Sequence, residues 1–337
     1  MLVDREGMGD VILKAPFLRA LRRAFPDHAV WWIATHQTAM ADELRPLFAS
    51  DVAEVITHAA LDGAPLPLLK RLRALGAFDL VFDSRTKMST VALARLGLRH
   101  RGFYCCLPGQ ILCDGETRLA RPRPGHIAQR MLAMLACAIG RTPDAPARLE
   151  ASAESRDEAF GLLPDGPTYV GIAPGSRQPD KNWPIARFHA VARGLVARGL
   201  TPVFLLGPKE TQVAADLGDT PGCVVLVAES QNPRPGQALD RLIARGQRLS
   251  ALLANDNGVG HLLGAAGVPV VSLFGPTDPR RWAPVAPANV ILEARSFDGD
   301  RDIAAIPADA ALQAVMTILG RGEARAGAAQ VPPAMKS

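Results

Sequence analysis

The sequence predicts an α/β protein built from two parallel sheets with crossover helices. Short apolar runs alternate with helical patterns along the whole chain, which is typical of parallel strands joined by helices. The length of 337 residues corresponds to two domains of ~100–200 residues each. Hydrophobic residues make up 48% and charged residues 21% of the chain, a globular composition that excludes a largely disordered or collagen-like protein.

In the first half, apolar runs predict three strands and one long helix. The strands are expected at Leu2–Val3, Ala29–Ile33 and Leu80–Phe82. Apolar residues near helical spacing predict a single helix from Val11 to Phe25, which Pro26 ends.

In the second half, buried strands alternate with helices. Strands are expected at Tyr169–Ala173, Val203–Leu206, Val224–Val227, Leu252–Ala254 and Val270–Phe274, and helices at Ile185–Arg198, Glu210–Leu217 and His261–Ala266. The turn-rich stretches Arg141–Pro146 and Leu163–Pro167 are candidate boundaries between the two halves. We therefore expect domains at 1–150 and 151–320, and a disordered tail at 321–337.

Neither a membrane span nor a disulfide framework is predicted. No apolar run reaches the ~18 residues of a spanning helix, and the first residues lack the pattern of a secretion signal. The five cysteines form no C-x-x-C pair. We expect a soluble cytoplasmic protein with reduced thiols.

The positive charge is concentrated in the first half. Residues 1–150 contain 20 basic and 15 acidic residues, whereas the rest of the chain contains 18 of each. Basic residues cluster at Lys70, Arg71 and Arg73, at Arg85 and Lys87, at Arg99 and Arg101, and at Arg118, Arg121 and Arg123. This charge indicates either an anionic partner or an ordinary solvated surface. Nucleic acid is a poor candidate partner, because aromatic residues make up only 5% and no nucleic-acid-binding motif is present.

The first candidate motif is Gly7-Met8-Gly9-Asp10, which follows the opening strand. A dinucleotide fingerprint needs a third glycine at position 12, where the chain has Ile12. The remaining glycine turn presents Asp10 at the carboxyl end of a strand, where doubly wound sheets bind ligands. The alternative is that Asp10 only caps a helix.

The second motif is Pro174-Gly175-Ser176-Arg177, followed by Lys181-Asn182-Trp183-Pro184. Backbone N–H groups, the Ser176 hydroxyl and the cations Arg177 and Lys181 suit phosphate oxygens. A surface loop with a buried Trp183 is the alternative.

The third motif runs from Asn255 to His261, with Phe274-Gly275-Pro276-Thr277-Asp278-Pro279 after the next strand. It places a glycine-rich loop at a helix N-terminus, which attracts anions. Asp256 could be only a helix cap and His261 a core histidine. However, so many polar groups are costly to bury without partners, which favours a ligand cleft.

Asp298-Gly299-Asp300 matches the D-x-D metal motif of some sugar transferases. It lies in a polar stretch with no apolar strand before it. A solvated loop is therefore the better interpretation, and we expect no essential metal.

Together these motifs resemble the ADP-heptose:lipopolysaccharide heptosyltransferases of glycosyltransferase family 9 over about residues 1–320. The resemblance rests on G-x-G-D at Gly7–Asp10, P-G-[ST] with K-x-W-P at Pro174–Ser176 and Lys181–Pro184, and D-[ST]-G-x-x-H with F-G-P-T-[DE]-P at Asp256–His261 and Phe274–Pro279. It implies the glycosyltransferase B architecture, in which two Rossmann-like domains face each other. The first domain would bind the acceptor and the second the nucleotide sugar.

The resemblance also implies an inverting, metal-independent reaction without a cofactor. Asp10 falls on the family's general base, and Lys181 on the lysine near the donor diphosphate. The donor-binding positions correspond to Ser176, Arg177, Asp256, Asn257, Gly258 and His261, and an acid that contacts the nucleoside corresponds to Glu210.

The chain departs from the family pattern at three positions. Asp4 stands where an apolar residue is usual, Asn257 replaces Ser or Thr, and Arg177 stands where small hydroxyl residues are common. The last two bear on donor contacts.

We therefore expect an enzyme that transfers heptose or a related sugar from a nucleotide, with ADP-heptose as the expected donor, to an anionic lipopolysaccharide core. We expect a cytoplasmic monomer with peripheral contact to the inner face of the membrane and no nucleic-acid partner. The alternatives are a nucleotide-sugar epimerase of the same architecture and a non-catalytic protein that binds sugar nucleotides or glycans.

Overall fold

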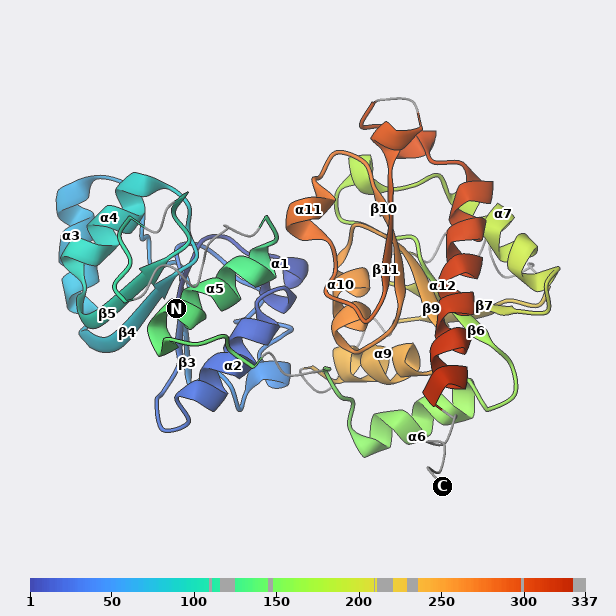
Figure 1. Cartoon of the computed structure of the whole chain (residues 1–337), viewed down its shortest axis with the longest axis horizontal. Helices are drawn as coiled ribbons and strands as arrows, with labels where there is room; N and C mark the ends of the chain where they lie inside the picture. Colours follow the sequence, from blue (N-terminus) through green and yellow to red (C-terminus); the bar gives the residue numbers. More distant parts are fainter. Residues whose placement is uncertain are drawn as a thin grey trace, which may run out of the picture. The chain divides into compact units, whose positions relative to one another are not determined.

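Two α/β units make up the chain, each built on its own parallel sheet (Figure 1). The structure, a computed structural model, describes residues 1–108, 111–115, 125–144, 148–208, 210, 221–228, 236–297 and 300–329. The first unit contains Met1–Ala147 and Arg280–Trp282, and the second contains Arg148–Pro279 and Ala283–Ser337.

The first unit has five parallel strands in the order β3-β2-β1-β4-β5. These are β1 (Leu2–Val3), β2 (Trp31–Ala34), β3 (Glu54–Ile56), β4 (Ala77–Asp83) and β5 (Arg99–Cys105). Its main helices are α1 (Met8–Ile12), α2 (Ala15–Ala24), α3 (Pro65–Ala74), α4 (Met88–Gly97) and α5 (Ile127–Ile139). In Figure 1, α3 lies beside α4, and α2 lies beside α5. The core on the α3–α4 side joins Leu68, Leu72 and Val91 to strand residues such as Val81 and Phe103.

The single helix predicted over Val11–Phe25 is wrong, because the structure has two helices there. After α1 the hydrogen bonds no longer follow the α-helical spacing of four residues, because the Lys14 N–H donates to the Val11 carbonyl, three residues back, at 3.0 Å. Pro16 has no N–H to donate to Ile12, so it ends the first helical ladder and begins the second.

The second unit has six parallel strands in the order β11-β10-β9-β6-β7-β8. They are β6 (Tyr169–Ala173), β7 (Thr201–Leu206), β8 (Val224–Val227), β9 (Ala251–Asn255), β10 (Val270–Phe274) and β11 (Asn289–Glu293). The helices are α6 (Ala153–Leu162), α7 (Ile185–Val196), α9 (Gln237–Gln247), α10 (Gly258–Ala265) and α12 (Ala308–Ala329). The short helix α11 (Pro279–Trp282) begins at the last residue of the segment Arg148–Pro279, and its other three residues belong to the first unit. Figure 1 shows α7 and α12 together, whereas α6, α9 and α10 lie together. This strand order is that of a complete dinucleotide-type sheet.

Continuous apolar runs made five of the six strands of the second sheet predictable, whereas the partly exposed edge strand β11 was not predicted. Tyr169–Ala173, Ala251–Asn255 and Val270–Phe274 are buried throughout, as expected for parallel strands covered on both faces. Beyond Gly320, α12 continues to Ala329; residues 330–337 of the expected tail, and most of the helix expected at Glu210–Leu217, lie outside the described residues. None of the helices in the described ranges is long and apolar enough to cross a membrane.

Candidate active site

The polar motifs lie at the carboxyl ends of the strands where each strand order reverses. In the first sheet this point lies between β1 and β4, and in the second between β6 and β9. Open parallel sheets bind ligands at such points. Asp10 follows β1, the Pro174–Ser176 loop follows β6, and the Asp256 loop follows β9.

Asp10 fixes the start of α1 from inside the helix. Gly7 is the N-cap residue, and its N–H donates to Asp10 Oδ2 at 2.9 Å. The alternative that Asp10 is itself the N-cap does not hold, because Asp10 is the third residue of α1 and reaches back to the cap. Its side chain is half-buried, so it is held by the turn while remaining partly open to solvent.

A buried ion pair that the motif analysis missed lies next to this turn. Lys14 contacts Glu6, and the second oxygen of Glu6 accepts from Trp32 Nε1 at 3.0 Å and from Thr38 Oγ1 at 3.2 Å. Lys14 Nζ also donates to Ser84 Oγ at 3.2 Å, which connects the turn to the end of β4. Burial raises the pKa of Glu6 above its usual value, although Lys14 opposes this shift. The sequence signal was an acid and a lysine on either side of the G-x-G-D turn.

Arg85 does not contribute to a solvated basic surface. Its side chain is 3% exposed and forms a two-point ion pair with Asp83, with Nε to Oδ1 at 2.9 Å and Nη2 to Oδ2 at 2.7 Å. Its Nη1 donates to the Leu61 carbonyl at 2.7 Å. Lys87, Arg99 and Arg101 are exposed as expected, whereas Arg118, Arg121 and Arg123 lie outside the described residues.

In the second unit, Asp256 gathers three of the predicted polar groups. Its Oδ2 accepts from Lys181 Nζ at 2.7 Å and from Thr277 Oγ1 at 2.6 Å, and its Oδ1 lies 3.7 Å from His261 Nε2. Burial alone would raise the pKa of Asp256, but the interactions with His261, Lys181 and Thr277 outweigh it and lower this pKa to about 2. Asp256 therefore carries a negative charge that holds Lys181 in place.

Asn257, rather than Asp256, is the N-cap of α10. Its Oδ1 accepts from the Gly260 N–H at 2.8 Å, and its Nδ2 donates to the carbonyls of Ala173 and Gly175 at 3.1 and 2.7 Å. The Asn257 amide accepts one hydrogen bond and donates two, whereas a serine or threonine hydroxyl has a single hydrogen to donate, so the departure from the family pattern joins the β6 loop to α10.

A second asparagine joins the same loop to the K-x-W-P segment. Asn255 Nδ2 donates to the Pro174 carbonyl, and its Oδ1 accepts from the Trp183 N–H at 3.3 Å. Trp183 is buried, and its Nε1 donates to the Ile306 carbonyl at 2.9 Å. Trp183 therefore anchors the loop that carries Lys181.

Glu210 lies against the glycine of the β6 loop. Its Oε2 accepts from the Gly207 N–H at 2.6 Å, and a Cβ built on Gly175 would lie 2.4 Å from Glu210 Oε1. Burial raises the pKa of Glu210, and the Gly207 hydrogen bond opposes this shift. A side chain at position 175 would therefore require this carboxylate to shift.

The remaining predicted donor-binding residues flank this cluster. Ser176 Oγ accepts from the Gln178 N–H at 3.3 Å, and Arg177 is exposed. Gly258 is the first residue of α10, where backbone N–H groups lie without helical partners. The structure thus brings Lys181, Asp256 and His261 together.

The described residues contain no group of three His, Cys, Asp or Glu side chains placed to hold a metal. Asp298 and Gly299 of the D-x-D sequence lie outside the described residues, and Asp300 is exposed.

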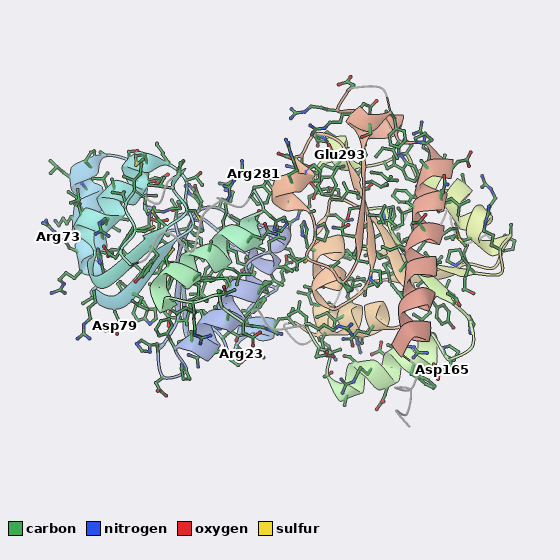
Figure 2. The ribbon with its side chains drawn as sticks, in the orientation of Figure 1. Arg23, Arg73, Asp79, Asp165, Arg281 and Glu293 are labelled. Atoms are coloured by element: carbon green, nitrogen blue, oxygen red, sulfur yellow. The ribbon has the colours of Figure 1, made fainter. Side chains whose placement is uncertain are left out.

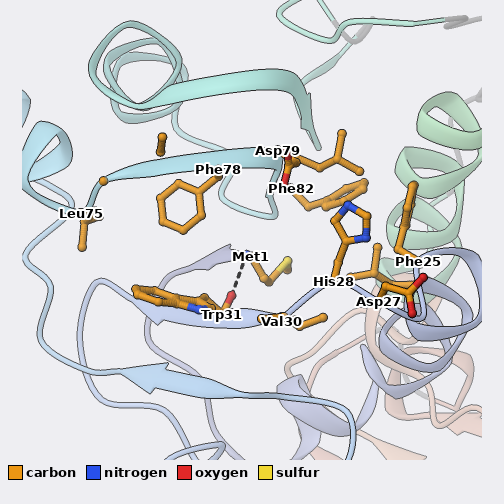
Figure 3. Close-up of a pocket in the computed structure, with 15 residues that line it drawn as sticks. Met1, Phe25, Asp27, His28, Val30, Trp31, Leu75, Phe78, Asp79 and Phe82 are labelled. Atoms are coloured by element: carbon orange, nitrogen blue, oxygen red, sulfur yellow. Dashed lines mark hydrogen bonds between the residues drawn. The ribbon is translucent and has the colours of Figure 1, made fainter.

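A cavity of about 500 Å³ lies in the first unit at the amino ends of β2 and β4 (Figure 3). It is lined by four aromatic side chains, Phe25, Trp31, Phe78 and Phe82. The rings of Trp31 and Phe78 pack edge to face, with their centroids 5.8 Å apart. Because Asp10 lies at the carboxyl ends of the strands, this cavity is separate from the candidate site.

Comparison with solved protein structures agrees with the fold described above. A 2-deoxy-2-fluoro ADP-heptose complex of E. coli heptosyltransferase WaaC has a TM-score of 0.59 at 19% identity, covering 94% of this chain and 99% of that one. The family 9 glycosyltransferase structure from Veillonella parvula has a TM-score of 0.66 at 22% identity, covering 95% and 97%. The two Rossmann-like sheets therefore have the fold called the glycosyltransferase B architecture.

The sequence comparisons identify the family. The model of glycosyltransferase family 9 (heptosyltransferase) matches residues 66–300. An Escherichia coli lipopolysaccharide heptosyltransferase 3 is 32% identical over 295 residues, which covers 82% of this chain and 83% of the relative. The chain belongs to glycosyltransferase family 9, the heptosyltransferases of lipopolysaccharide biosynthesis.

Proposed function

We propose that this enzyme transfers heptose from ADP-heptose to a hydroxyl of the lipopolysaccharide inner core, with inversion at the anomeric carbon and without a metal. The observation that carries the proposal is the Lys181–Asp256–His261–Thr277 cluster at the end of β9. Support for the donor comes from the ADP-heptose analogue named with the E. coli structure. Support for the acceptor comes from the lipopolysaccharide heptosyltransferase relatives.

In this mechanism Asp10 takes the proton from the acceptor hydroxyl as its oxygen attacks the anomeric carbon. The bond from that carbon to the diphosphate breaks, and ADP leaves. A positioned carboxylate supplies ~10²–10⁴-fold of base catalysis.

Lys181 offsets the charge that develops on the leaving diphosphate. Asp256 Oδ2 accepts from the Lys181 ammonium, and Thr277 donates to the same oxygen. Because these contacts fix the cation in place, little reorganisation is needed during the reaction. Ser176, Arg177 and the first N–H groups of α10 contact the phosphates, whereas Glu210 contacts the nucleoside. The enzyme works as a monomer at the inner face of the cytoplasmic membrane, where its basic first unit attracts the anionic acceptor.

The test is a panel of nucleotide sugars incubated with the protein, with and without a truncated core glycolipid. If the enzyme transfers heptose, nucleotide should be released from ADP-heptose, and this release should depend on the glycolipid. An epimerase would convert a nucleotide sugar without acceptor, and a binding protein would release no nucleotide; either result contradicts the proposal.

Two further measurements separate the roles of the groups involved. Lys181→Ala should weaken ADP binding and lower turnover, at a cost of about 2–4 kcal/mol in transition-state stabilisation; unchanged kinetics would place Lys181 outside the site.

EDTA should leave transfer intact, and activity lost in EDTA but restored by Mg²⁺ or Mn²⁺ would establish a metal requirement.

A further inference from the structure

The most exposed large apolar side chains in the described ranges belong to the first unit. Leu66 of α3 is 81% exposed and Leu96 of α4 is 74% exposed. In the second unit the highest value is 49%, at Phe160, whose ring is covered by the Arg248 guanidinium at 5.1 Å. Exposed apolar side chains that gather in one region mark interaction sites, whereas scattered ones are ordinary.

Leu66 and Leu96 lie on neighbouring helices that cover the same face of the sheet. The two helices touch at Gly97, where an added Cβ would lie 2.8 Å from Leu72 Cδ1. Both bury their other sides, through Leu68 and Leu72 in α3 and through Val91 and Ala94 in α4. Their outer sides therefore point away from the same sheet.

The outer side of α4 carries an apolar stripe. Met88, Ala92 and Leu96 are spaced four residues apart and so lie on one side of the helix. Met88 is 46% exposed and Ala92 is partly exposed.

The outer side of α3 adds positive charge to this surface. Leu66, Lys70 and Arg73 are spaced as i, i+4 and i+7 and are all exposed; Figure 2 shows Arg73 extending away from α3. Neither Pro65–Ala74 nor Met88–Gly97 contains an acidic residue. We name this surface, formed by Leu66, Lys70, Arg73, Met88 and Leu96, the α3–α4 face.

We propose that the α3–α4 face docks onto the surface of an anionic phospholipid membrane. Leucine and methionine side chains enter the boundary between headgroups and acyl chains, while lysine and arginine stay at the phosphates. The face contains no aromatic residue, unlike the aromatic-rich centres of protein interfaces. This inference rests on the proposed function, since a lipid-linked acceptor would be met at that surface.

Sedimentation with vesicles tests the proposal without an activity measurement. The full chain should bind phosphatidylglycerol–phosphatidylethanolamine vesicles at 0.1 M salt and bind phosphatidylcholine vesicles far more weakly. Lys70→Gln with Arg73→Gln should lower the partition constant about 25-fold, since each basic residue contributes about fivefold (about 1 kcal/mol). Leu66→Gln with Leu96→Gln should lower it about tenfold or more.

Matched changes in the second unit provide the control. Arg193 and Arg198 are exposed, as are Leu162 and Met316; Arg193→Gln with Arg198→Gln, and Leu162→Gln with Met316→Gln, should leave vesicle binding within twofold. Circular dichroism melting should show that all four double variants are folded.

Three results would overturn the proposal: no binding of the wild type to anionic vesicles, equal losses in the control variants, or a dimer that dissociates when Leu66 and Leu96 are replaced. The proposed function is tested separately, with a delipidated core oligosaccharide as acceptor. Transfer to this soluble acceptor should be unchanged in the α3–α4 variants. If it proceeds while vesicle binding fails, only the docking proposal falls; if it is absent in the wild type as well, the proposed function falls.

Discussion

At the scale of single residues, Asp10 provides the most direct test of the chemistry. Asp10→Asn should nearly abolish transfer, because an amide cannot accept the hydroxyl proton, while ADP affinity stays within a few-fold. The amide can still accept the Gly7 N–H through its oxygen, so α1 should keep its start. Turnover and ADP titration of the same preparation measure both effects, and near-normal turnover would remove Asp10 from the mechanism.

The depressed pKa of Asp256 predicts a specific pH dependence of stability. Its folded pKa of about 2 lies below the usual 3.8, so ionised Asp256 stabilises the fold above about pH 4, and this stabilisation is lost as the pH falls through 2. The contribution is about 2 kcal/mol at neutral pH. Asp256→Asn should therefore have a lower free energy of unfolding than wild type at pH 7, and this gap in unfolding free energy should shrink towards pH 2.

Urea unfolding at a series of pH values measures this gap. Asp165→Asn is the control, because Asp165 pairs with Arg248 but its side chain is 78% exposed. Its gap from wild type should be small at every pH. A gap for Asp256→Asn that does not change between pH 4 and 2 would contradict the assignment.

At the scale of elements, the loop after β6 depends on the absence of a side chain at Gly175. Gly175→Ala would place a Cβ 2.4 Å from Glu210 Oε1, so the carboxylate must move away from the Gly207 N–H. ADP should bind about tenfold more weakly, a loss of about 1.4 kcal/mol. Isothermal titration measures this. Gly161→Ala in α6, where an added Cβ meets nothing within 4 Å, should bind ADP normally.

Elements with a strong local signal were predictable from the sequence, and those with polar or short segments were not. The apolar run Val270–Phe274 coincides with β10, whereas β5 opens with Arg-His-Arg and β3 has only three residues, all at least partly exposed. Both first-sheet strands lack the continuous apolar pattern that identifies a buried parallel strand.

The candidate site shows the same limit. Residue types and spacing indicated Lys181, Asp256 and His261, which the structure brings into one cluster. The burial of Arg85 was not evident, because its partner Asp83 lies one residue beyond the predicted strand Leu80–Phe82, and spacing does not specify that the chain folds back to pair the two side chains. Likewise, the contact between Lys14 and Glu6 depends on the turn between them, which spacing alone does not specify.

At the scale of the whole molecule, the positive charge of the first half should act on encounter with the acceptor. Reversing Lys87 and Arg99 to glutamate should raise the apparent KM for the glycolipid, more strongly at low salt, because exposed charges act through a field screened over ~10 Å at 0.1 M salt. Donor KM should barely change. Arg85 is excluded from this test, since reversing a buried, paired charge would disturb the fold.

The salt dependence of the glycolipid KM is the measurement, and Arg193→Glu with Arg198→Glu in the second unit is the control. The control should leave both the KM and its salt dependence unchanged. A KM insensitive to salt in wild type and in the first-unit variant would mean that the excess positive charge lies on an ordinary solvated surface and does not attract the acceptor.

The two asparagines at the end of β9 determine how much conformational entropy a ligand must remove. Asn255 and Asn257 already hydrogen-bond the backbone at Ala173, Pro174, Gly175 and Trp183. Ordering a free backbone costs ~1–2 kcal/mol per residue, and folding has already met that cost for these loops. A nucleotide that binds there meets a preorganised surface, so more of its contact energy remains as affinity.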